Sequence, residues 1–223
     1  MKIACVIPAY NEEKNIAKII EQVKKIVDLV VVVNDHSSDK TKEILDNIND
    51  LKIAVLHHPI NLGQGAALQT GNDYSIKYGC DIIVHFDADG QFLAEDIKKI
   101  ISPIIEENYD IVFGSRFMEI KSEIPKFKKN IIMPIAKIFN RLFFNIKTSD
   151  PQNGFRAMKN SVAEKIKIEN DRMAHCTEIL AKAFKYRLKI KEVPVKVLYT
   201  EFGQKFSGGF KIIKDLFLKK ISN

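Results

Sequence analysis

The first 115 residues alternate short apolar runs with longer stretches in which apolar residues recur every three or four positions. The apolar runs, rich in Val and Ile, occupy residues 3–7, 29–33, 53–58, 81–86 and 110–114. The stretches with helical spacing occupy residues 12–25, 39–48, 63–78 and 95–107. Continuous apolar runs without strict alternation are typical of strands that are covered on both faces. The pattern therefore predicts an α/β fold with a mainly parallel central sheet flanked by crossover helices.

The pattern changes after Arg116. Residues 118–129 are polar, basic and interrupted by Pro125, which predicts a loop, and the spacing over 131–146 predicts an amphipathic helix. The remaining segments predict, in order, a turn and strand over 150–159, a helix over 177–186, an edge-like strand over 189–199, a glycine-rich loop over 202–209 and a basic amphipathic helix over 210–221. Because no repeat or linker divides the chain, we expect one domain spanning residues 1–223.

Charge is distributed unevenly between the two parts of the chain. The totals of 35 Lys+Arg and 28 Asp+Glu give a net charge of +7. Residues 1–120 carry 12 basic and 19 acidic side chains, whereas residues 121–223 carry 23 basic and 9 acidic ones. The basic part predicts an anionic partner, such as a phosphate group, a nucleic acid or a lipid surface.

The cysteines and the apolar runs indicate the cellular compartment in which the protein is expected. Three widely spaced cysteines favour neither a disulfide framework nor a cysteine zinc site, which suits a reducing environment. The start of the chain does not look like a signal peptide, and the longest apolar run, residues 29–33, is far short of a membrane span. We therefore expect a cytoplasmic protein that is either soluble or peripheral to a membrane.

Two aspartates follow the fourth predicted strand. Asp87 and Asp89 stand in the segment HFDADGQ, where the chain leaves the sheet, and ligands of open α/β sheets bind at such ends. Two carboxylates this close repel each other unless a divalent cation lies beside them. Mg²⁺ or Mn²⁺ takes oxygen ligands and completes its shell with water and substrate phosphates, and Gln91 could add a neutral oxygen. The alternative is a helix N-cap with acidic residues in the first turn, which explains one of the aspartates.

The ends of the first two predicted strands carry further candidates. Asp35 follows the second strand and could accept hydrogen bonds from a ribose or a base, whereas residues 37–39 look like the cap of the next helix. After the first strand, Pro8 and Tyr10 could form an edge on which a base packs, and Glu12 could hydrogen-bond that base. Alternatively, Asn11 only caps the first helix.

Three other features are weaker candidates. Residues 63–71 are glycine-rich but lack the Lys-Ser/Thr of a P-loop and the GxGxxG spacing, so close packing is the favoured interpretation. His175 and Cys176 lack a plausible partner for thiol catalysis and are interpreted as a core or loop pair. Arg156 either pairs with Asp150 or contacts a phosphate, and the sequence leaves both open.

Seven segments carry a family resemblance. They are VIPAYNE, NDHSSDKT, NLGQGAALQTG, DADGQ, FGSRF, DPQNGFRA and EVPV, and they follow the order and spacing of family 2 glycosyltransferases. Over residues 3–205 the chain resembles the branch that contains dolichyl-phosphate mannose and glucose synthases and bacterial polyprenyl-phosphate glycosyltransferases. The resemblance implies a Rossmann-like fold that binds a nucleotide-diphosphate sugar, a divalent metal, and sugar transfer with inversion at the anomeric carbon.

The resemblance also implies roles for individual residues. Nucleotide contacts fall to Pro8, Tyr10, Glu12 and Asp35. The donor and metal motif comprises Asp87, Ala88 and Asp89, with Gln91 as a further metal ligand. Phosphate contacts fall to Arg116 and, through a less specific match, Lys205. The sequence departs from the family where many relatives have two adjacent aspartates, since it has Asn34-Asp35, and it has Tyr199-Thr200-Glu201 where the synthases have an arginine.

These observations predict a metal-dependent inverting glycosyltransferase that uses Mg²⁺ or Mn²⁺, with Asp89 and Arg116 acting at the reacting phosphates. Residues 1–116 are expected to bind the nucleotide sugar and residues 117–223 to face the acceptor. A lipid-phosphate acceptor needs no general base, whereas a hydroxyl acceptor needs one, for which Glu178 is the candidate. The other interpretation of Glu178 is a charge at a helix N-terminus.

Two other functional classes are less favoured. A sugar nucleotidyltransferase would carry a glycine- and arginine-rich first loop, and VIPAYNE occupies that place. A nucleic-acid-binding protein would suit the pI of 9.1, but the sequence shows no nucleic-acid-binding motif. The basic segments 121–147 and 205–220 predict instead a contact with anionic lipid on the cytoplasmic face of a membrane, unless their apolar faces pack on the sheet.

Overall fold

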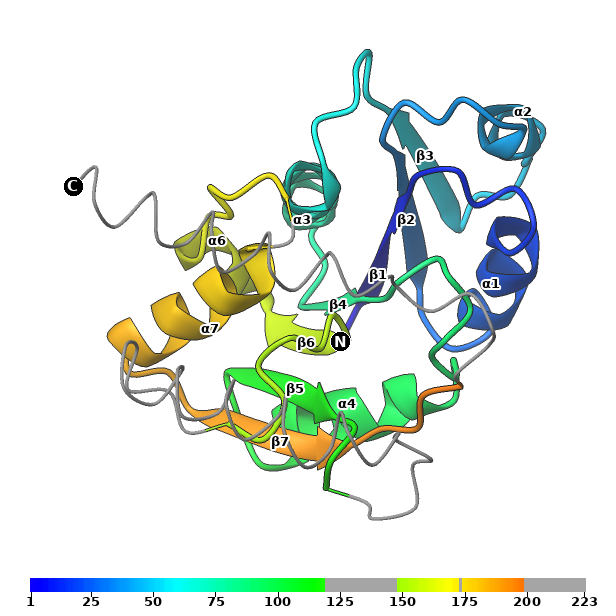
Figure 1. Ribbon diagram of the computed structural model, residues 1–223. Coiled ribbons are helices and arrows are strands. Elements are labelled where there is room, and N and C mark those ends of the chain that lie inside the picture. The colour runs from blue at the N-terminus through cyan, green and yellow to red at the C-terminus, as the bar shows by residue number, and fades with distance from the viewer. Residues whose placement is uncertain (119–147, 173, 199–223) are drawn as a thin grey trace, which may run out of the picture.

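The computed structural model describes residues 1–118, 148–172 and 174–198 (Figure 1). The strands are β1 (Ile3–Ala9), β2 (Leu29–Asn34), β3 (Ile53–His57), β4 (Ile82–His85), β5 (Ile111–Ser115), β6 (Arg156–Lys159) and β7 (Ile190–Pro194). The helices are α1 (Ile16–Val23), α2 (Thr41–Asp46), α3 (Gln64–Lys77), α4 (Asp96–Glu106), α6 (Asn160–Lys165) and α7 (His175–Lys185).

All of these strands belong to one sheet, in the order β3-β2-β1-β4-β6-β5-β7. β6 is antiparallel to both of its neighbours, β4 and β5, and the other pairs are parallel. The predicted α/β fold with a mainly parallel sheet is therefore confirmed. Because β1 lies between β2 and β4, the strand order reverses at β1 and β4, which is where open α/β sheets bind their ligands.

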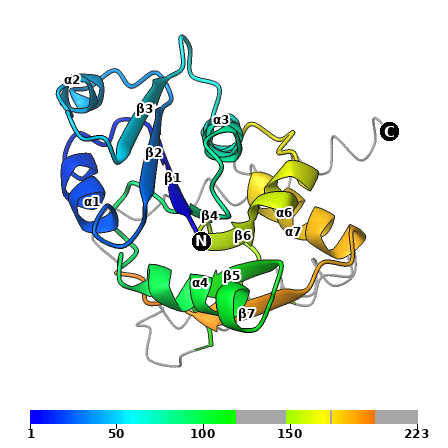
Figure 2. The same ribbon diagram turned by 180° about the vertical axis from the view of Figure 1, so that it is seen from behind.

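The two faces of the sheet carry separate apolar cores. Along β1, Cys5 and Ile7 belong to one core with α1, α2 and α4, whereas Ala4 and Val6 belong to the other with α3, α6 and α7. Figures 1 and 2 show the two groups of helices on opposite sides of the sheet. The continuous Val and Ile runs follow from this arrangement, because both side-chain directions of each inner strand are buried.

Close packing explains the glycine-rich start of α3. A Cβ atom at Gly65 would lie 2.0 Å from the backbone oxygen of Asn170, and one at Gly71 would lie 2.2 Å from Cγ1 of Val6. The amide of Gly65 also donates a hydrogen bond to the oxygen of Asp171 at 2.7 Å. The packing interpretation of residues 63–71 is therefore confirmed.

The structure differs from the prediction at the first turn. The predicted helix begins at residue 12, but α1 begins at Ile16, after a turn over residues 13–15 that follows Asn11, whose φ is 57°. Asn11 does not cap this helix: its Oδ1 accepts a hydrogen bond from the amide of Ser38, and its own amide donates to Oγ of Ser37. This residue therefore ties the end of β1 to the loop after β2.

Several predicted elements lie outside the described residues. They are the helix over 131–146, the loop over 202–209, the helix over 210–221 and most of the loop over 118–129. Among the described residues, no helix has both the length and the apolar character that crossing a membrane requires.

Candidate active site

The carboxyl ends of the parallel strands bring the predicted site residues to one edge of the sheet. Tyr10 follows β1, Asp35 follows β2, Asp87 lies just beyond β4 and Arg116 follows β5. Segment 150–155 reaches the same edge, since it leads into the antiparallel strand β6.

Asp87 is mostly enclosed by protein. Its Oδ1 accepts a hydrogen bond from Nε2 of Gln64 at 2.8 Å. The backbone of segment 150–155 lies close to the other oxygen, Oδ2. At Gly154 it leaves no room for a side chain, since an added Cβ atom would lie only 2.5 Å from Oδ2. Burial, and then the charge of Asp89, raise the pKa of Asp87 to about 7. An ionised carboxylate here gains from a cation more than an ordinary surface carboxylate does.

Asp89 lies at the exposed rim of the same site. Its Oδ1 accepts a hydrogen bond from the amide of Gln91 at 3.0 Å, and the backbone oxygen of Gln91 accepts one from the amide of Leu198. Partial loss of water raises the pKa of the Asp89 carboxyl. Ala88, between the two aspartates, is buried. The pair of acidic groups, each easier to ionise beside a cation, fits a hard divalent metal.

The described residues contain no group of three or more His, Cys, Asp or Glu side chains arranged to bind a metal. Among the described residues, a cation at this position would thus have the carboxylates of Asp87 and Asp89, and its other ligands could be Gln91, water and the anionic oxygens of substrate phosphates. Mg²⁺ is commonly bound in this way.

The turn after β1 adjoins this acidic pair. Burial, and the negative charges of Asp89 and Asp39, raise the pKa of Glu12, whose carboxylate also accepts a hydrogen bond from Asn15 at 3.2 Å. Tyr10 is 50% exposed, which leaves its ring available to a ligand. Pro8 is buried within β1, which opposes a direct contact between its ring and a base.

Asp35 has a structural role that the sequence did not indicate. Its Oδ1 accepts a hydrogen bond from the amide of Leu62 at 2.9 Å and lies 2.8 Å from Nδ1 of His58, and its Oδ2 accepts one from the amide of Gly63 at 2.7 Å. The residue is buried. These contacts favour a role in shaping the turn before α3 over the predicted contact with a ribose or base.

A buried cluster near Asp87 joins Arg156 to His175 and Cys176, a contact that the sequence did not indicate. Arg156 is fully buried, and its guanidinium donates to the oxygens of Asn153 and Gly154 and, at 3.0 Å, to Sγ of Cys176. Nε2 of His175 lies 3.4 Å from the same sulfur. Burial disfavours the Cys176 thiolate, but the charges of His175 and Arg156 outweigh it and lower the pKa to about 6.

This cluster confirms that His175 and Cys176 are core residues. Arg156 does not pair with Asp150, which was one of its two predicted roles. It contacts the thiol and two backbone oxygens instead, and Asp150 pairs with Arg116. The thiol lies 20 positions from Arg156 in the sequence, so no local pattern links them.

Glu178 lies in the first turn of α7 with a side chain only 8% exposed. Its Oε1 and Oε2 accept hydrogen bonds from the amides of Glu169 and Asn170, and Lys182 forms an ion pair with it at 2.7 Å. Although burial opposes ionisation, these contacts lower the pKa of Glu178. A carboxylate engaged in this way is a weak general base, so the structural interpretation of Glu178 is favoured.

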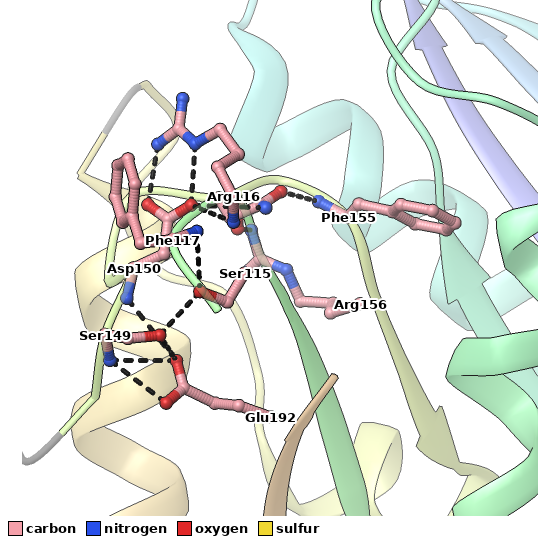
Figure 3. Close-up of polar contacts among 9 residues, drawn as sticks. Ser115, Arg116, Phe117, Ser149, Asp150, Phe155, Arg156 and Glu192 are labelled. Atoms are coloured by element: carbon pink, nitrogen blue, oxygen red, sulfur yellow. Dashed lines mark hydrogen bonds and ion pairs between the residues drawn. The ribbon is translucent and has the colours of Figure 1, made fainter. Parts of the chain in front are cut away.

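Arg116 lies at the end of β5, where its guanidinium forms two short bonds to Asp150 (Figure 3). Lys205, the other predicted phosphate contact, lies outside the described residues.

Comparison with known proteins agrees with this geometry. Residues 4–167 match the family model for glycosyl transferase family 2. The UDP-N-acetylglucosamine–dolichyl-phosphate N-acetylglucosaminyltransferase of Methanococcus voltae is 35% identical over 98% of this chain and 96% of its own length. The polyprenol monophosphomannose synthase of Mycolicibacterium smegmatis is 26% identical over 95% of this chain and 83% of its own length.

A solved structure supports the fold independently. The crystal structure of glucosyl-3-phosphoglycerate synthase from Mycobacterium tuberculosis, in complex with Mn²⁺, UDP and phosphoglyceric acid, covers 99% of this chain and 78% of its own chain. It superposes with a TM-score of 0.75 at 16% identity, so the likeness concerns the fold. With the family match and the relatives above, the conclusion is that this chain belongs to glycosyl transferase family 2 and is a glycosyltransferase.

Proposed function

We propose that this glycosyltransferase uses Mg²⁺ or Mn²⁺ to transfer a sugar, with inversion, from a nucleotide-diphosphate donor to a polyprenyl phosphate. The observation that carries the proposal is the pair Asp87 and Asp89 beside Glu12 and Tyr10, where the strand order of the sheet reverses. The names of the two relatives, which refer to dolichyl phosphate and polyprenol, support the acceptor. The Mn²⁺ and UDP in the crystal neighbour support the donor and metal.

Each part of the proposed donor site has a distinct task. Asp87, Asp89 and the side chain of Gln91 would hold the cation, which when bound stabilises the charge on the departing nucleoside diphosphate. Tyr10 offers an exposed ring on which the base can pack, and Glu12 can accept a hydrogen bond from the nucleoside. Of the remaining family positions, the buried Pro8 and Asp35 would act by shaping the strand ends, and Ala88 by leaving room between the aspartates.

The state of Glu178 bears on the acceptor. A lipid phosphate is already an anionic nucleophile, so its attack on the anomeric carbon requires no proton acceptor. A hydroxyl acceptor does require one, and the carboxylate proposed for it is bonded to two amides and to Lys182. The arrangement thus favours the phosphate acceptor over a hydroxyl of a cell-surface glycan. Arg116 and Lys205 would add positive charge around the donor or acceptor phosphate.

A lipid acceptor also requires contact with a membrane. We include in the proposal that residues 117–223 face the acceptor and that the segments 121–147 and 205–220 bind the cytoplasmic face of anionic membranes. The first has seven Lys or Arg against one Glu, and the second has five Lys against one Asp. Each basic residue adds about 1 kcal/mol near anionic lipid. We expect the protein to float with anionic vesicles at low salt, and its absence from that fraction would contradict the membrane contact.

The donor half of the proposal is tested by a thermal-shift panel. UDP-, GDP- and dTDP-sugars are each added with and without Mn²⁺, and the melting temperature is compared with that of the free protein. A ligand that binds only the folded state at 100 times its Kd stabilises it by about 2.7 kcal/mol. We expect one nucleotide class to raise the melting temperature strongly only when Mn²⁺ is present. Equal shifts with and without the metal would contradict the assignment of Asp87 and Asp89.

A further inference from the structure

One carboxylate, that of Asp150, binds both the backbone and the side chain of Arg116. Oδ2 accepts hydrogen bonds from the Arg116 amide at 3.1 Å and from Nε at 2.6 Å, and Oδ1 accepts one from Nη2 at 2.6 Å (Figure 3). The two side-chain bonds form the parallel, bidentate pair that fixes the plane of a guanidinium. The third bond fixes the backbone from which that side chain extends.

The pair is unequally buried. The side chain of Asp150 is 1% exposed, whereas that of Arg116 is 24% exposed. A carboxylate removed from water in this way depends on its donors, because an uncompensated buried charge is unfavourable. The arrangement therefore places the acid in the interior and presents the guanidinium at the surface.

A second acidic residue holds Asp150 in place. Glu192, on β7, accepts hydrogen bonds at Oε1 from the amide and Oγ of Ser149, both at 2.9 Å, and from the Asp150 amide at 3.4 Å. Oγ of Ser149 also lies 2.5 Å from Oγ of Ser115, the last residue of β5. The residue before Asp150 is thus attached to two strands, and the carboxylate has a fixed position relative to the sheet.

The same segment reaches the acidic pair of the donor site. From Asp150 the chain runs to Gly154, which packs against Oδ2 of Asp87, and to Phe155, whose oxygen accepts a hydrogen bond from the amide of Gly114 at 2.9 Å. Segment 150–155 therefore contacts Arg116 at one end and Asp87 at the other. The segment therefore connects the guanidinium of Arg116 with the proposed metal ligand Asp87.

We propose that Asp150 is a positioning residue, which holds the Arg116 guanidinium in the orientation that binds a phosphate group of the donor or the acceptor. This inference rests on the proposed function. Fixing the guanidinium before the substrate binds reduces the entropy lost on binding and keeps the charge aligned with the reacting phosphate. The donor phosphate and the acceptor phosphate would bind a guanidinium in the same way. The Michaelis constants of the two substrates distinguish them, because only that of the contacted substrate should rise strongly in the variants.

The test is a double-mutant cycle on sugar transfer to polyprenyl phosphate, with the variants Arg116→Lys, Asp150→Asn and the two combined. Lysine keeps the charge but cannot form the bidentate pair. We expect Arg116→Lys to lower kcat/KM by on the order of 100-fold and Asp150→Asn by roughly 10- to 100-fold. Because Asp150 acts through Arg116, the combined variant should be no less active than Arg116→Lys alone. The Michaelis constant of one substrate should rise more than that of the other.

Asp110→Asn is the matched control, since Asp110 pairs with Lys159 at 2.9 Å beside the other end of β5, and it should leave kcat/KM within about twofold. If Asp150→Asn does not fold, as judged by its melting curve, Asp150→Glu replaces it in the cycle. The positioning role would be overturned if the loss of kcat/KM in the combined variant equalled the product of the losses in the two single variants. Wild-type kcat/KM in the Asp150 variant would also overturn it. Either result would leave the proposed function intact. A wild-type protein that transfers no sugar would overturn both.

Discussion

Asp89→Asn should abolish the metal-dependent part of donor binding and leave the fold intact. The side chain lies at an exposed rim, and its hydrogen bond from the Gln91 amide can be kept by the asparagine Oδ1. The substitution therefore removes a negative charge with little change of shape. Since partial loss of water disfavours the Asp89 carboxylate until a cation arrives, losing this charge should not destabilise the free protein.

Isothermal titration with a sugar nucleotide and Mn²⁺ measures the effect. We expect the Kd of the variant to rise by on the order of 100-fold in the presence of Mn²⁺ and to equal the wild-type Kd in its absence. Asp73→Asn is the control, because it also removes one carboxylate, from an exposed pair with Lys167. Unchanged affinity of the Asp89 variant in Mn²⁺ would exclude this residue from the metal site.

Asp87→Asn should stabilise the metal-free protein at neutral and alkaline pH. Burial and the charge of Asp89 raise the folded-state pKa of this carboxyl from 3.8 to about 7. A raised folded-state pKa contributes stability that is fully present below the unfolded pKa and is lost as the pH rises through the folded one. The rise from 3.8 to about 7 corresponds to about 4 kcal/mol. The wild type should thus lose up to that amount between pH 4 and 7, and the asparagine variant should not.

Urea unfolding of both proteins between pH 4 and 9 gives the difference directly. Cys176, whose pKa is lowered to about 6 in the folded state, acts in the opposite direction, since its contribution is present at high pH and lost as the pH falls through 6. It is common to both proteins, so the comparison at each pH largely removes it. Added Mn²⁺ should reduce the difference in free energy of unfolding between the two proteins, because it stabilises the wild type alone. A variant no more stable than wild type at pH 8 would contradict the electrostatic account of Asp87.

The sequence predicted those parts of the fold that leave a periodic signal. β1, β2 and β4 appear as Val and Ile runs because helices cover both faces of the sheet, and α4 appears through its buried Ile97, Ile100 and Ile104. α6 was missed because its six residues are too few to establish a helical period. The antiparallel direction of β6 was not predictable either, because a four-residue strand carries no signal of its orientation.

The site was predictable where its residues follow strands and unpredictable where it depends on contacts across the sheet. Asp87 and Asp89 are recognisable because they lie within four residues of the end of β4. The pairing of Arg116 with Asp150 joins residues 34 positions apart, and only the placement of β6 between β4 and β5 brings their segments together. Glu178 shows the converse, since its position in the sequence allowed either a base or a charge at a helix N-terminus, and only the amides of residues 169 and 170 that engage its carboxylate distinguish the two.

Transfer of a radiolabelled sugar to a polyprenyl phosphate in anionic vesicles measures the proposed metal-dependent reaction itself. The nucleotide that gives the metal-dependent thermal shift supplies the labelled donor, and each reaction is run with Mn²⁺ and with a chelator. We expect a labelled lipid product with inverted anomeric configuration, formed together with one nucleoside diphosphate per sugar and only when the metal is present. A lipid product formed equally well in the chelator, or nucleoside diphosphate released without any lipid product, would contradict it.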